Sequence, residues 1–221
     1  RRRQKLIEEA PSPVLTPKLR QKMGQAAIDV VKAAGYHSVG TVEFLLDENH
    51  HFYFMEVNTR IQVEHSVTEE LTGIDLVKEQ IKVAMGSKLS FQQKDIQFNG
   101  HVIQFRINAE DPTRNFAPSP GVLEYYLPPG GPHVRVDSAC YSGYLIPPTY
   151  DSMVAKLIVH GKDREQAIAI GKRALREFHI GGVHSTIPFH LYMLEDEKFL
   201  AVDFNLNYID GLIDEGCQFT L

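Results

Sequence analysis

Residues 41–58 have the sequence TVEFLLDENHHFYFMEVN, and this stretch sets how the first part of the chain is expected to fold. β-Branched and aromatic residues are concentrated in 41–46 and in 52–58, whereas the intervening residues 47–50, DENH, are polar and typical of a loop. The pattern therefore predicts two strands that pair as an antiparallel hairpin.

Helices are expected on both sides of this hairpin. The Thr-Pro pair at 16–17 is typical of a helix start, and apolar residues at helical spacing predict helices over 16–35, 66–72 and 75–85. The polar stretch 88–99 has only a weak pattern, and we place a domain boundary there.

The second half of the chain also mixes the two kinds of element. We expect strands over 101–109 and 153–160, helices over 163–178 and 185–194, and short strands with turns in the proline-rich segment 112–148. Helices and antiparallel pairs in both halves predict an α+β fold.

The hairpin carries two carboxylates whose positions suggest chemistry. If its loop covers residues 48–51, then Asp47 pairs with Phe52, and Glu43 lies directly opposite Glu56. Two carboxylates at that spacing repel each other unless a cation lies between them or one is protonated. The pair therefore suggests a cation site.

The residues that follow extend this hypothesis. Asn58 points to the same side as Glu56 because side chains alternate along a strand, and two carboxylates with an amide suit Mg²⁺ or Mn²⁺ better than zinc. Since Mg²⁺ completes its shell with water and phosphate oxygens, the spacing suggests a site for a magnesium nucleotide. Arg60, Gln62 and Glu64 then alternate with apolar residues, which favours a neighbouring site for a small planar anion and a base.

Two less functional interpretations of the hairpin remain open. Both glutamates could simply lie on a solvated face. A loop one residue longer would shift the register and separate the two carboxylates.

Composition narrows the classes of protein. Of the 221 residues 43% are hydrophobic, which excludes wholesale disorder. The net charge is -5, so no nucleic-acid partner is expected. No apolar run is long enough to span a membrane, so no membrane partner is expected.

The two cysteines, Cys140 and Cys217, lack CxxC spacing, which fits a reducing compartment, and we expect a cytoplasmic location. The start, RRRQK at 1–5, has neither an initiator Met nor a signal peptide, which suggests a longer protein.

Several ordered blocks resemble the biotin carboxylase family, a branch of the ATP-grasp enzymes. The blocks are EVNTRIQVEH at 56–65, RRRQKLIEEAP at 1–11, FRINAED at 105–111, PSPG at 118–121, PGG at 129–131 and YDSM at 150–153. The resemblance implies that residues 1–90 are the second half of an ATP-grasp domain and residues 100–215 a biotin carboxylase C-terminal domain. It points to the biotin carboxylase subunit of an acetyl-CoA carboxylase, which serves fatty acid biosynthesis.

The resemblance also implies an activity. ATP, with two Mg²⁺ or Mn²⁺ ions, would activate bicarbonate as carboxyphosphate, and the carboxyl group would pass to biotin on a carrier. The implied partners are the biotin carboxyl carrier protein and the carboxyltransferase subunits, and a homodimer is possible.

The matching positions imply roles for individual residues. The implied metal ligands are Glu43, Glu56 and Asn58, of which the two glutamates also contact ATP. The implied bicarbonate ligands are Lys5, Arg60, Gln62 and the backbone of Val63. Glu64 would be the general base, Arg106 would face biotin, and Leu45 and Leu206 would line the adenine pocket. The catalytic set is then Glu64, Arg60, Arg106 and Lys5.

The chain departs from the family pattern at four points. Arg3, Ser66 and Thr149 replace residues that are common in the family, and Pro132 and His133 put dimerisation by the family's interface in doubt.

A glycine-rich phosphate lid is not seen in these residues, so we expect that this stretch alone does not turn over ATP. The alternatives are the biotin carboxylase part of a pyruvate, propionyl-CoA or urea carboxylase, another ATP-grasp ligase such as a carbamoyl-phosphate synthetase, and a non-catalytic nucleotide-binding or dimerisation module.

Overall fold

The structure is a computed structural model that describes residues 4–219 of the chain. The arginines at 1–3, including the departure at Arg3, and residues 220–221 lie outside the described residues. The chain packs as two compact units: the first is Pro11–Asn99, and the second combines the residues up to Ala10 with those from Gly100 onward.

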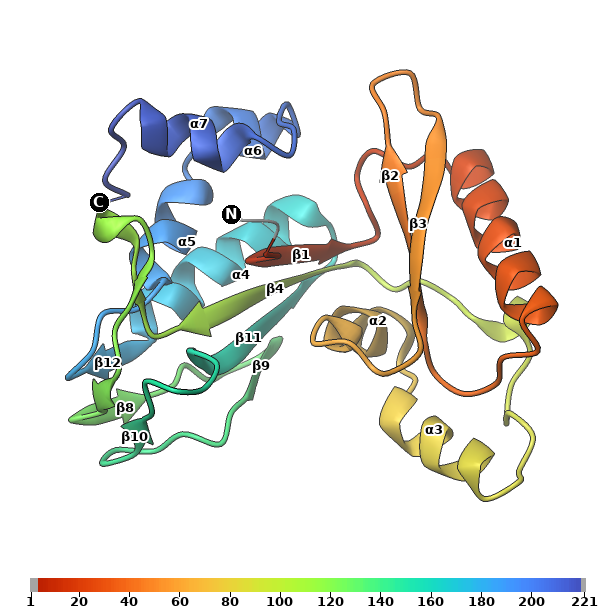
Figure 1. The fold of residues 1–221 in the computed structure, drawn as a ribbon, viewed down its shortest axis with the longest axis horizontal. Helices are drawn as coiled ribbons and strands as arrows, with labels where there is room; N and C mark the ends of the chain where they lie inside the picture. The colour runs from red at the N-terminus through yellow and green to blue at the C-terminus, as the bar shows by residue number, and fades with distance from the viewer. Residues whose placement is uncertain (1–3, 220–221) are drawn as a thin grey trace. The chain divides into compact units, whose positions relative to one another are not determined.

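The first unit consists of the hairpin and three α-helices (Figure 1). Strands β2 (Thr41–Leu46) and β3 (Phe52–Asn58) pair antiparallel, as the sequence predicts. The helices are α1 (Pro17–Ala33), α2 (His65–Thr72) and α3 (Leu76–Ala84), and a short 3-10 turn, η1 (Gln93–Asp95), follows them.

The ends of these helices follow their capping residues. The Leu19 amide donates to Thr16 Oγ1 over 3.2 Å at the start of α1, and the Lys78 amide donates to Asp75 Oδ1 over 2.8 Å at the start of α3. Gly73 ends α2 with a φ of 71°, a left-handed conformation that favours glycine. The three predicted helices of this unit are therefore confirmed to within a few residues.

The second unit is built on a four-stranded sheet in the order β1-β4-β11-β9. Its strands are β1 (Ile7–Ala10), β4 (His101–Asn108), β11 (Met153–Gly161) and β9 (Val134–Asp137), and every neighbouring pair is antiparallel. Strand β1 is not among the predicted elements. It pairs with β4 across a long stretch of sequence, and Glu8 lies opposite Gln104.

Helix α4 (Arg164–Glu177) covers one face of this sheet (Figure 1). Phe105 and Leu157 are fully buried in the core between them, together with Ala174 of the helix. Gly171 allows the close approach, because a Cβ there would lie 3.1 Å from Phe105 Cε2. The backbone amide of Gln166 donates to Asp163 Oδ1 over 2.8 Å, which confirms the predicted helix start.

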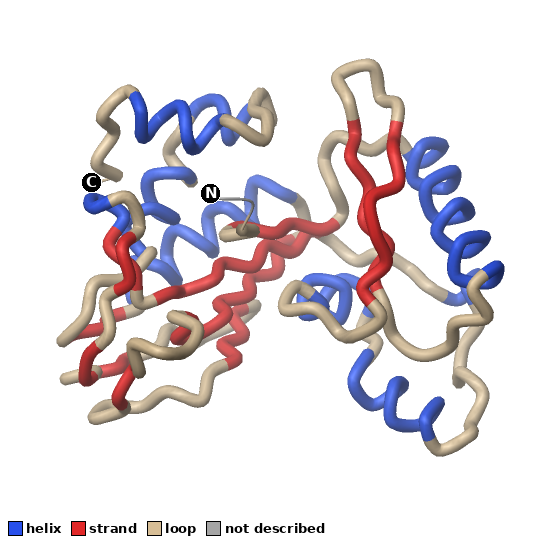
Figure 2. Tube along the Cα trace, viewed as in Figure 1, coloured by secondary structure: helices blue, strands red, loops and turns tan. Residues whose placement is uncertain are grey.

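Short strands and turns fill the proline-rich part, as Figure 2 shows. The pairs are β5 (Glu110–Asp111) with β6 (Ala117–Pro118), β7 (Gly121–Val122) with β10 (Leu145–Ile146), and β8 (Tyr125–Leu127) with β12 (His179–Gly181); η2 (Pro112–Arg114) follows β5. Helix α5 (Ile187–Met193) matches a predicted helix, whereas α6 (Glu197–Ala201) and α7 (Tyr208–Asp214) do not. Among the described residues, no helix has the length and apolar character needed to cross a membrane.

Candidate functional site

The register of the hairpin brings Glu43 opposite Glu56, as predicted, but by a different route. Leu46, not Asp47, pairs with Phe52, so the loop is one residue longer than the predicted one. A β-bulge then inserts Met55 as an extra residue in β3 and restores the pairing of the two glutamates. The longer loop alone would have separated the carboxylates, and the bulge compensates for it.

One amide group bridges the two carboxylates. Asn58 Nδ2 donates to Glu43 Oε1 over 3.0 Å and to Glu56 Oε1 over 2.9 Å. The expected alternation, with Asn58 and Glu56 on one side of β3, is therefore confirmed. Gln62 Nε2 adds a second donor to Glu43 Oε1 at 2.8 Å. These amide donors lie where a cation would otherwise offset the repulsion between the carboxylates.

The donor set fits a hard cation such as Mg²⁺. Glu43 Oε1 and Glu56 Oε1 both lie within 3.0 Å of a single atom, Asn58 Nδ2, so a cation in that place could reach both oxygens. Within residues 4–219, no group of three or more His, Cys, Asp or Glu side chains is placed to hold a metal ion. A cation here would thus have two carboxylates from the chain and would need oxygens from water and a ligand, which is the usual preference of Mg²⁺.

Arg60 and Gln62 lie beside the carboxylate pair. Arg60 Nη2 donates to Asn58 Oδ1 over 3.3 Å, and its Nη1 donates to the Ile61 carbonyl over 3.2 Å. The Gln62 side chain is buried, and its Oε1 has no hydrogen-bond partner among the described residues. A cationic fork and a buried amide oxygen next to two carboxylates form a polar site that can bind both a cation and an anion.

The alternation of polar and apolar residues after Asn58 does not lie on a strand. Strand β3 ends at Asn58, and the chain turns until α2 begins at His65. His65 Nδ1 lies 2.7 Å from the Gln62 carbonyl, and the half-buried Glu64 occupies the N-cap position of α2. This turn brings the Gln62 side chain back to Glu43, as the hydrogen bond of 2.8 Å between Gln62 Nε2 and Glu43 Oε1 shows.

Arg106 lies on β4 in the second unit and is held by a residue that the sequence did not reveal. Its Nε donates to Glu8 Oε1 on β1 over 2.6 Å, and its Nη2 lies 2.5 Å from the same oxygen. Glu8 lies in the RRRQKLIEEAP block at 1–11, but a contact between residues 98 positions apart leaves no local signal in the sequence.

The remaining predicted site residues are distributed over both units. Leu45 on β2 is exposed, Leu206 precedes α7 and is 85% exposed, and Lys5 precedes β1. Val63 lies in the turn before α2. Their roles, like those of the other site residues, stay predictions.

His190 of α5 is a buried titratable group of the second unit. Its side chain is fully buried, and Nε2 lies 2.8 Å from the Arg106 carbonyl. Desolvation by burial lowers the pKa of His190 to about 4, and the hydrogen bond from the imidazole to the carbonyl only partly opposes this. The imidazole is therefore neutral near pH 7.

Two sequence families match this chain. The biotin carboxylase C-terminal domain matches residues 104–211, and the carbamoyl-phosphate synthase L chain, ATP binding domain, matches residues 1–92. Biotin carboxylase 1 of Bacillus subtilis is 59% identical over 211 residues, which are 95% of this chain and 47% of that protein. A subunit of the pyruvate carboxylase of Methanothermobacter thermautotrophicus is 56% identical, over 95% of this chain and 43% of that protein.

Solved structures agree with these relatives. A biotin carboxylase complex from Campylobacter jejuni has a TM-score of 0.92 and 48% identity, covering 96% of this chain and 47% of that one. The biotin carboxylase domain dimer of the Hydrogenobacter thermophilus 2-oxoglutarate carboxylase, in complex with MgADP, ADP and bicarbonate, has a TM-score of 0.94 and 47% identity, covering 98% and 48%. The chain thus spans about half the length of its relatives. The α+β fold, the second half of an ATP-grasp domain followed by a biotin carboxylase C-terminal domain, is confirmed, and the chain belongs to the biotin carboxylase family.

Proposed function

We propose that this chain takes part in the ATP-dependent carboxylation of biotin on a carrier protein, with bicarbonate as the carbon source and carboxyphosphate as the intermediate. Residues 1–90 would act as the second half of the ATP-grasp domain and residues 100–215 as the C-terminal domain. The observation that carries the proposal is the pair of carboxylates, Glu43 and Glu56, joined by the Asn58 amide in a chain of this family.

The hairpin residues would hold the metal ions and the anion. Glu43 and Glu56 supply carboxylate oxygens, and Asn58 can present its amide oxygen after the side chain rotates. Mg²⁺ or Mn²⁺ bound there would neutralise the phosphate oxygens of ATP during phosphoryl transfer. The Arg60 fork and the Gln62 amide, with Lys5 and the Val63 backbone, would hold bicarbonate.

Two further residues would handle the proton and the acceptor. Glu64 would take the proton of bicarbonate, because a carboxylate can act as a general base. Arg106 would stabilise the negative charge that develops on the ureido oxygen of biotin. Leu45 and Leu206 would contact the adenine ring.

The family membership leaves the parent enzyme to be proposed. We favour a biotin carboxylase subunit of acetyl-CoA carboxylase, in the cytoplasm, with the carrier protein and carboxyltransferase subunits as partners and a homodimer as a possible assembly. A pyruvate, propionyl-CoA or urea carboxylase is the alternative, and the relative that belongs to a pyruvate carboxylase supports it. The match of residues 104–211 to the biotin carboxylase C-terminal domain argues against a carbamoyl-phosphate synthetase.

Carboxylation of free biotin by the full-length protein tests the proposal. We expect Glu64→Gln and Arg106→Ala each to lower the rate at least a hundredfold, which is on the order of the contribution of one general base or one charge-stabilising donor. Glu48→Gln, which alters an exposed carboxylate in the loop of the same hairpin, is the matched control and should leave the rate unchanged.

Two outcomes would contradict this function. Unchanged rates in both variants would refute the assigned roles. Binding of Mg²⁺ or nucleotide without any turnover in the full-length protein would favour a non-catalytic module instead. Residues 1–221 by themselves are expected to show no bicarbonate-dependent ATP hydrolysis.

A further inference from the structure

Arg106 is held at both its side chain and its backbone, and the residues that hold it are outside the predicted site. We propose that Glu8 is a positioning residue that presets the Arg106 guanidinium for the acceptor substrate, an inference that rests on the proposed function of Arg106. The two residues lie on neighbouring strands, β1 and β4, within the same unit.

The side-chain contact is a charged pair with little exposure to water. Arg106 Nε donates to Glu8 Oε1 over 2.6 Å, and the two side chains are 16% and 9% exposed. Gln104 Nε2 donates to the other oxygen, Glu8 Oε2, over 3.1 Å. Both carboxylate oxygens are therefore held, which fixes the plane of the carboxylate and with it the orientation of the guanidinium.

The backbone carbonyl of Arg106 is also held, by two residues far along the chain. The Arg106 carbonyl accepts hydrogen bonds from Thr186 Oγ1 at 2.9 Å and from His190 Nε2 at 2.8 Å. Thr186 Oγ1 in turn accepts a hydrogen bond from the backbone amide of Asn108 at 3.0 Å, so the hydroxyl connects two positions of β4. With the backbone fixed in this way, the direction of the Arg106 side chain depends on what its guanidinium contacts.

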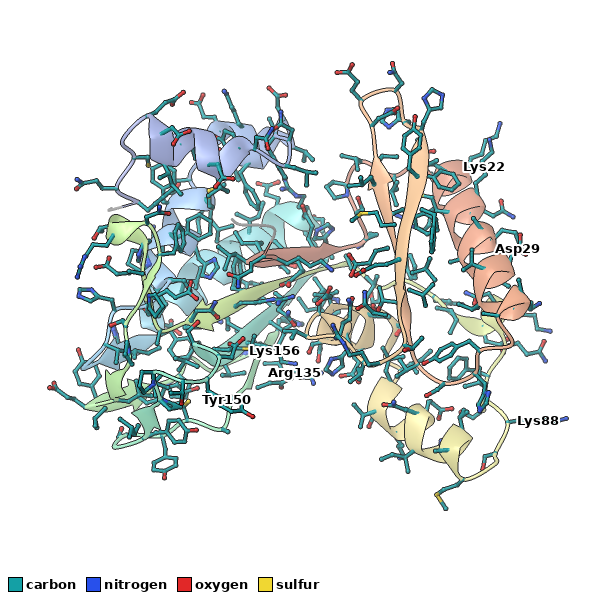
Figure 3. All side chains as sticks on the ribbon, viewed as in Figure 1. Lys22, Asp29, Lys88, Arg135, Tyr150 and Lys156 are labelled. Carbon is teal, nitrogen blue, oxygen red and sulfur yellow. The ribbon has the colours of Figure 1, made fainter. Side chains whose placement is uncertain are left out.

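A neighbouring charge makes the contact with Glu8 more important. Lys156 lies directly opposite Arg106 in the β4–β11 ladder, a pairing of like charges that is unfavourable by itself. Lys156 and Arg135, labelled in Figure 3, contact Asp137 on β9, at 3.1 Å from Nζ and 2.8 Å from Nε. Burial tends to raise the pKa of Asp137, but the hydrogen bonds from Arg135 and Lys156 outweigh it and hold the pKa below its ordinary value. Each of the opposed cations thus has a carboxylate on the strand outside it, Glu8 on one side and Asp137 on the other.

Loss of Glu8 would leave the guanidinium to be ordered when the substrate binds. Ordering a long cationic side chain costs about 1.5–2 kcal/mol, which corresponds to a rate change on the order of ten- to thirtyfold. In the folded protein Glu8 already holds the Arg106 side chain, so the free-energy cost of ordering it is met during folding and not during substrate binding. We therefore expect Glu8 to affect the step at biotin and not the binding of ATP.

Glu9 provides a matched control on the same strand. It points to the opposite face of β1 and lies 2.8 Å from both His101 Nε2 and Arg164 Nε. Glu9→Gln and Glu8→Gln each remove one partly buried carboxylate that is paired with an arginine, so their structural costs should be similar. Of the two, Glu8→Gln is the one that removes the carboxylate contact of Arg106.

The experiment compares the full-length variants in the carboxylation of free biotin. Glu8→Gln should lower kcat/KM for biotin by about tenfold or more and leave the KM for ATP unchanged, whereas Glu9→Gln should leave both parameters near wild type. In the Arg106→Ala background, Glu8→Gln should have no further effect, because the residue acts through Arg106. Thermal unfolding of each variant shows whether the fold is kept, and if Glu8→Gln unfolds, Glu8→Asp replaces it with the same expected direction.

The outcomes separate this inference from the function on which it rests. If Arg106→Ala retains the wild-type rate, the proposed role of Arg106 fails. If Arg106→Ala loses activity but Glu8→Gln matches Glu9→Gln, only the positioning role fails. A full effect of Glu8→Gln in the absence of the Arg106 side chain would also overturn it.

Discussion

The carboxylate pair of the hairpin should make the stability of the first unit depend on divalent cations. Asn58 Nδ2 lies 3.0 Å from Glu43 Oε1 and 2.9 Å from Glu56 Oε1, so the two oxygens are at most about 6 Å apart. Two unit charges at that separation repel by about 0.7 kcal/mol at the dielectric constant of water and by about 3 kcal/mol at an effective dielectric constant of about 20. Because Glu56 is exposed, we expect a net repulsion of about 1 kcal/mol.

Glu56→Gln removes one charge while keeping the shape and an acceptor for Asn58. This variant should slow amide exchange in β2 and β3 about fivefold without metal, which corresponds to about 1 kcal/mol. Millimolar Mg²⁺ at low ionic strength should slow exchange in the wild-type hairpin by at least the same factor, since a cation relieves the repulsion. The variant should lose most of this response.

Hydrogen exchange measured with and without Mg²⁺ tests whether relief of the repulsion between Glu43 and Glu56 stabilises the hairpin. Glu48→Gln is the control for a general loss of negative charge. Glu48 is exposed in the same hairpin loop, so its variant should respond to Mg²⁺ as the wild type does. A wild-type hairpin that is indifferent to Mg²⁺, or faster exchange in metal-free Glu56→Gln, would refute the reasoning.

Three further predictions concern the fold. The pKa of His190 is lowered from 6.5 to about 4 in the folded protein. Between these pH values only the unfolded chain binds the proton, so the free energy of unfolding decreases as the pH falls. At 1.36 kcal/mol for each pH unit, the decrease is about 3 kcal/mol. Urea unfolding from pH 7 to pH 4 measures this, and a pH dependence that is the same in His190→Gln would contradict it. Gly171→Ala places a Cβ 3.1 Å from Phe105 Cε2 and should cost about 1–3 kcal/mol in the second unit, so an unchanged unfolding midpoint would show that the core adjusts freely. Thr16→Ala removes the cap of α1 and should cost about 1 kcal/mol, visible as faster amide exchange in its first turn but not in α3.

Local patterns in the sequence were sufficient for most elements of the first unit. The cap at Thr16 and the polar loop of the hairpin depend on neighbouring residues, and both appear in the structure where they were expected. The register of the hairpin was correct at Glu43 and Glu56 but for an incomplete reason. A longer loop and a bulge at Met55 have opposite effects on the register, and neither has a distinctive local signature.

The sequence by itself determined the family, the α+β fold class and the nearness of Glu43, Glu56 and Asn58, because these follow from ordered motifs and from short-range strand geometry. Only the tertiary structure decided that β1 pairs with β4 and that Glu8 holds Arg106. That contact joins residues 98 positions apart, and its stability comes from burial and strand pairing that no periodic pattern encodes. Folding of the chain thus brings in the residues that position Arg106, an arginine that the sequence motif had already indicated.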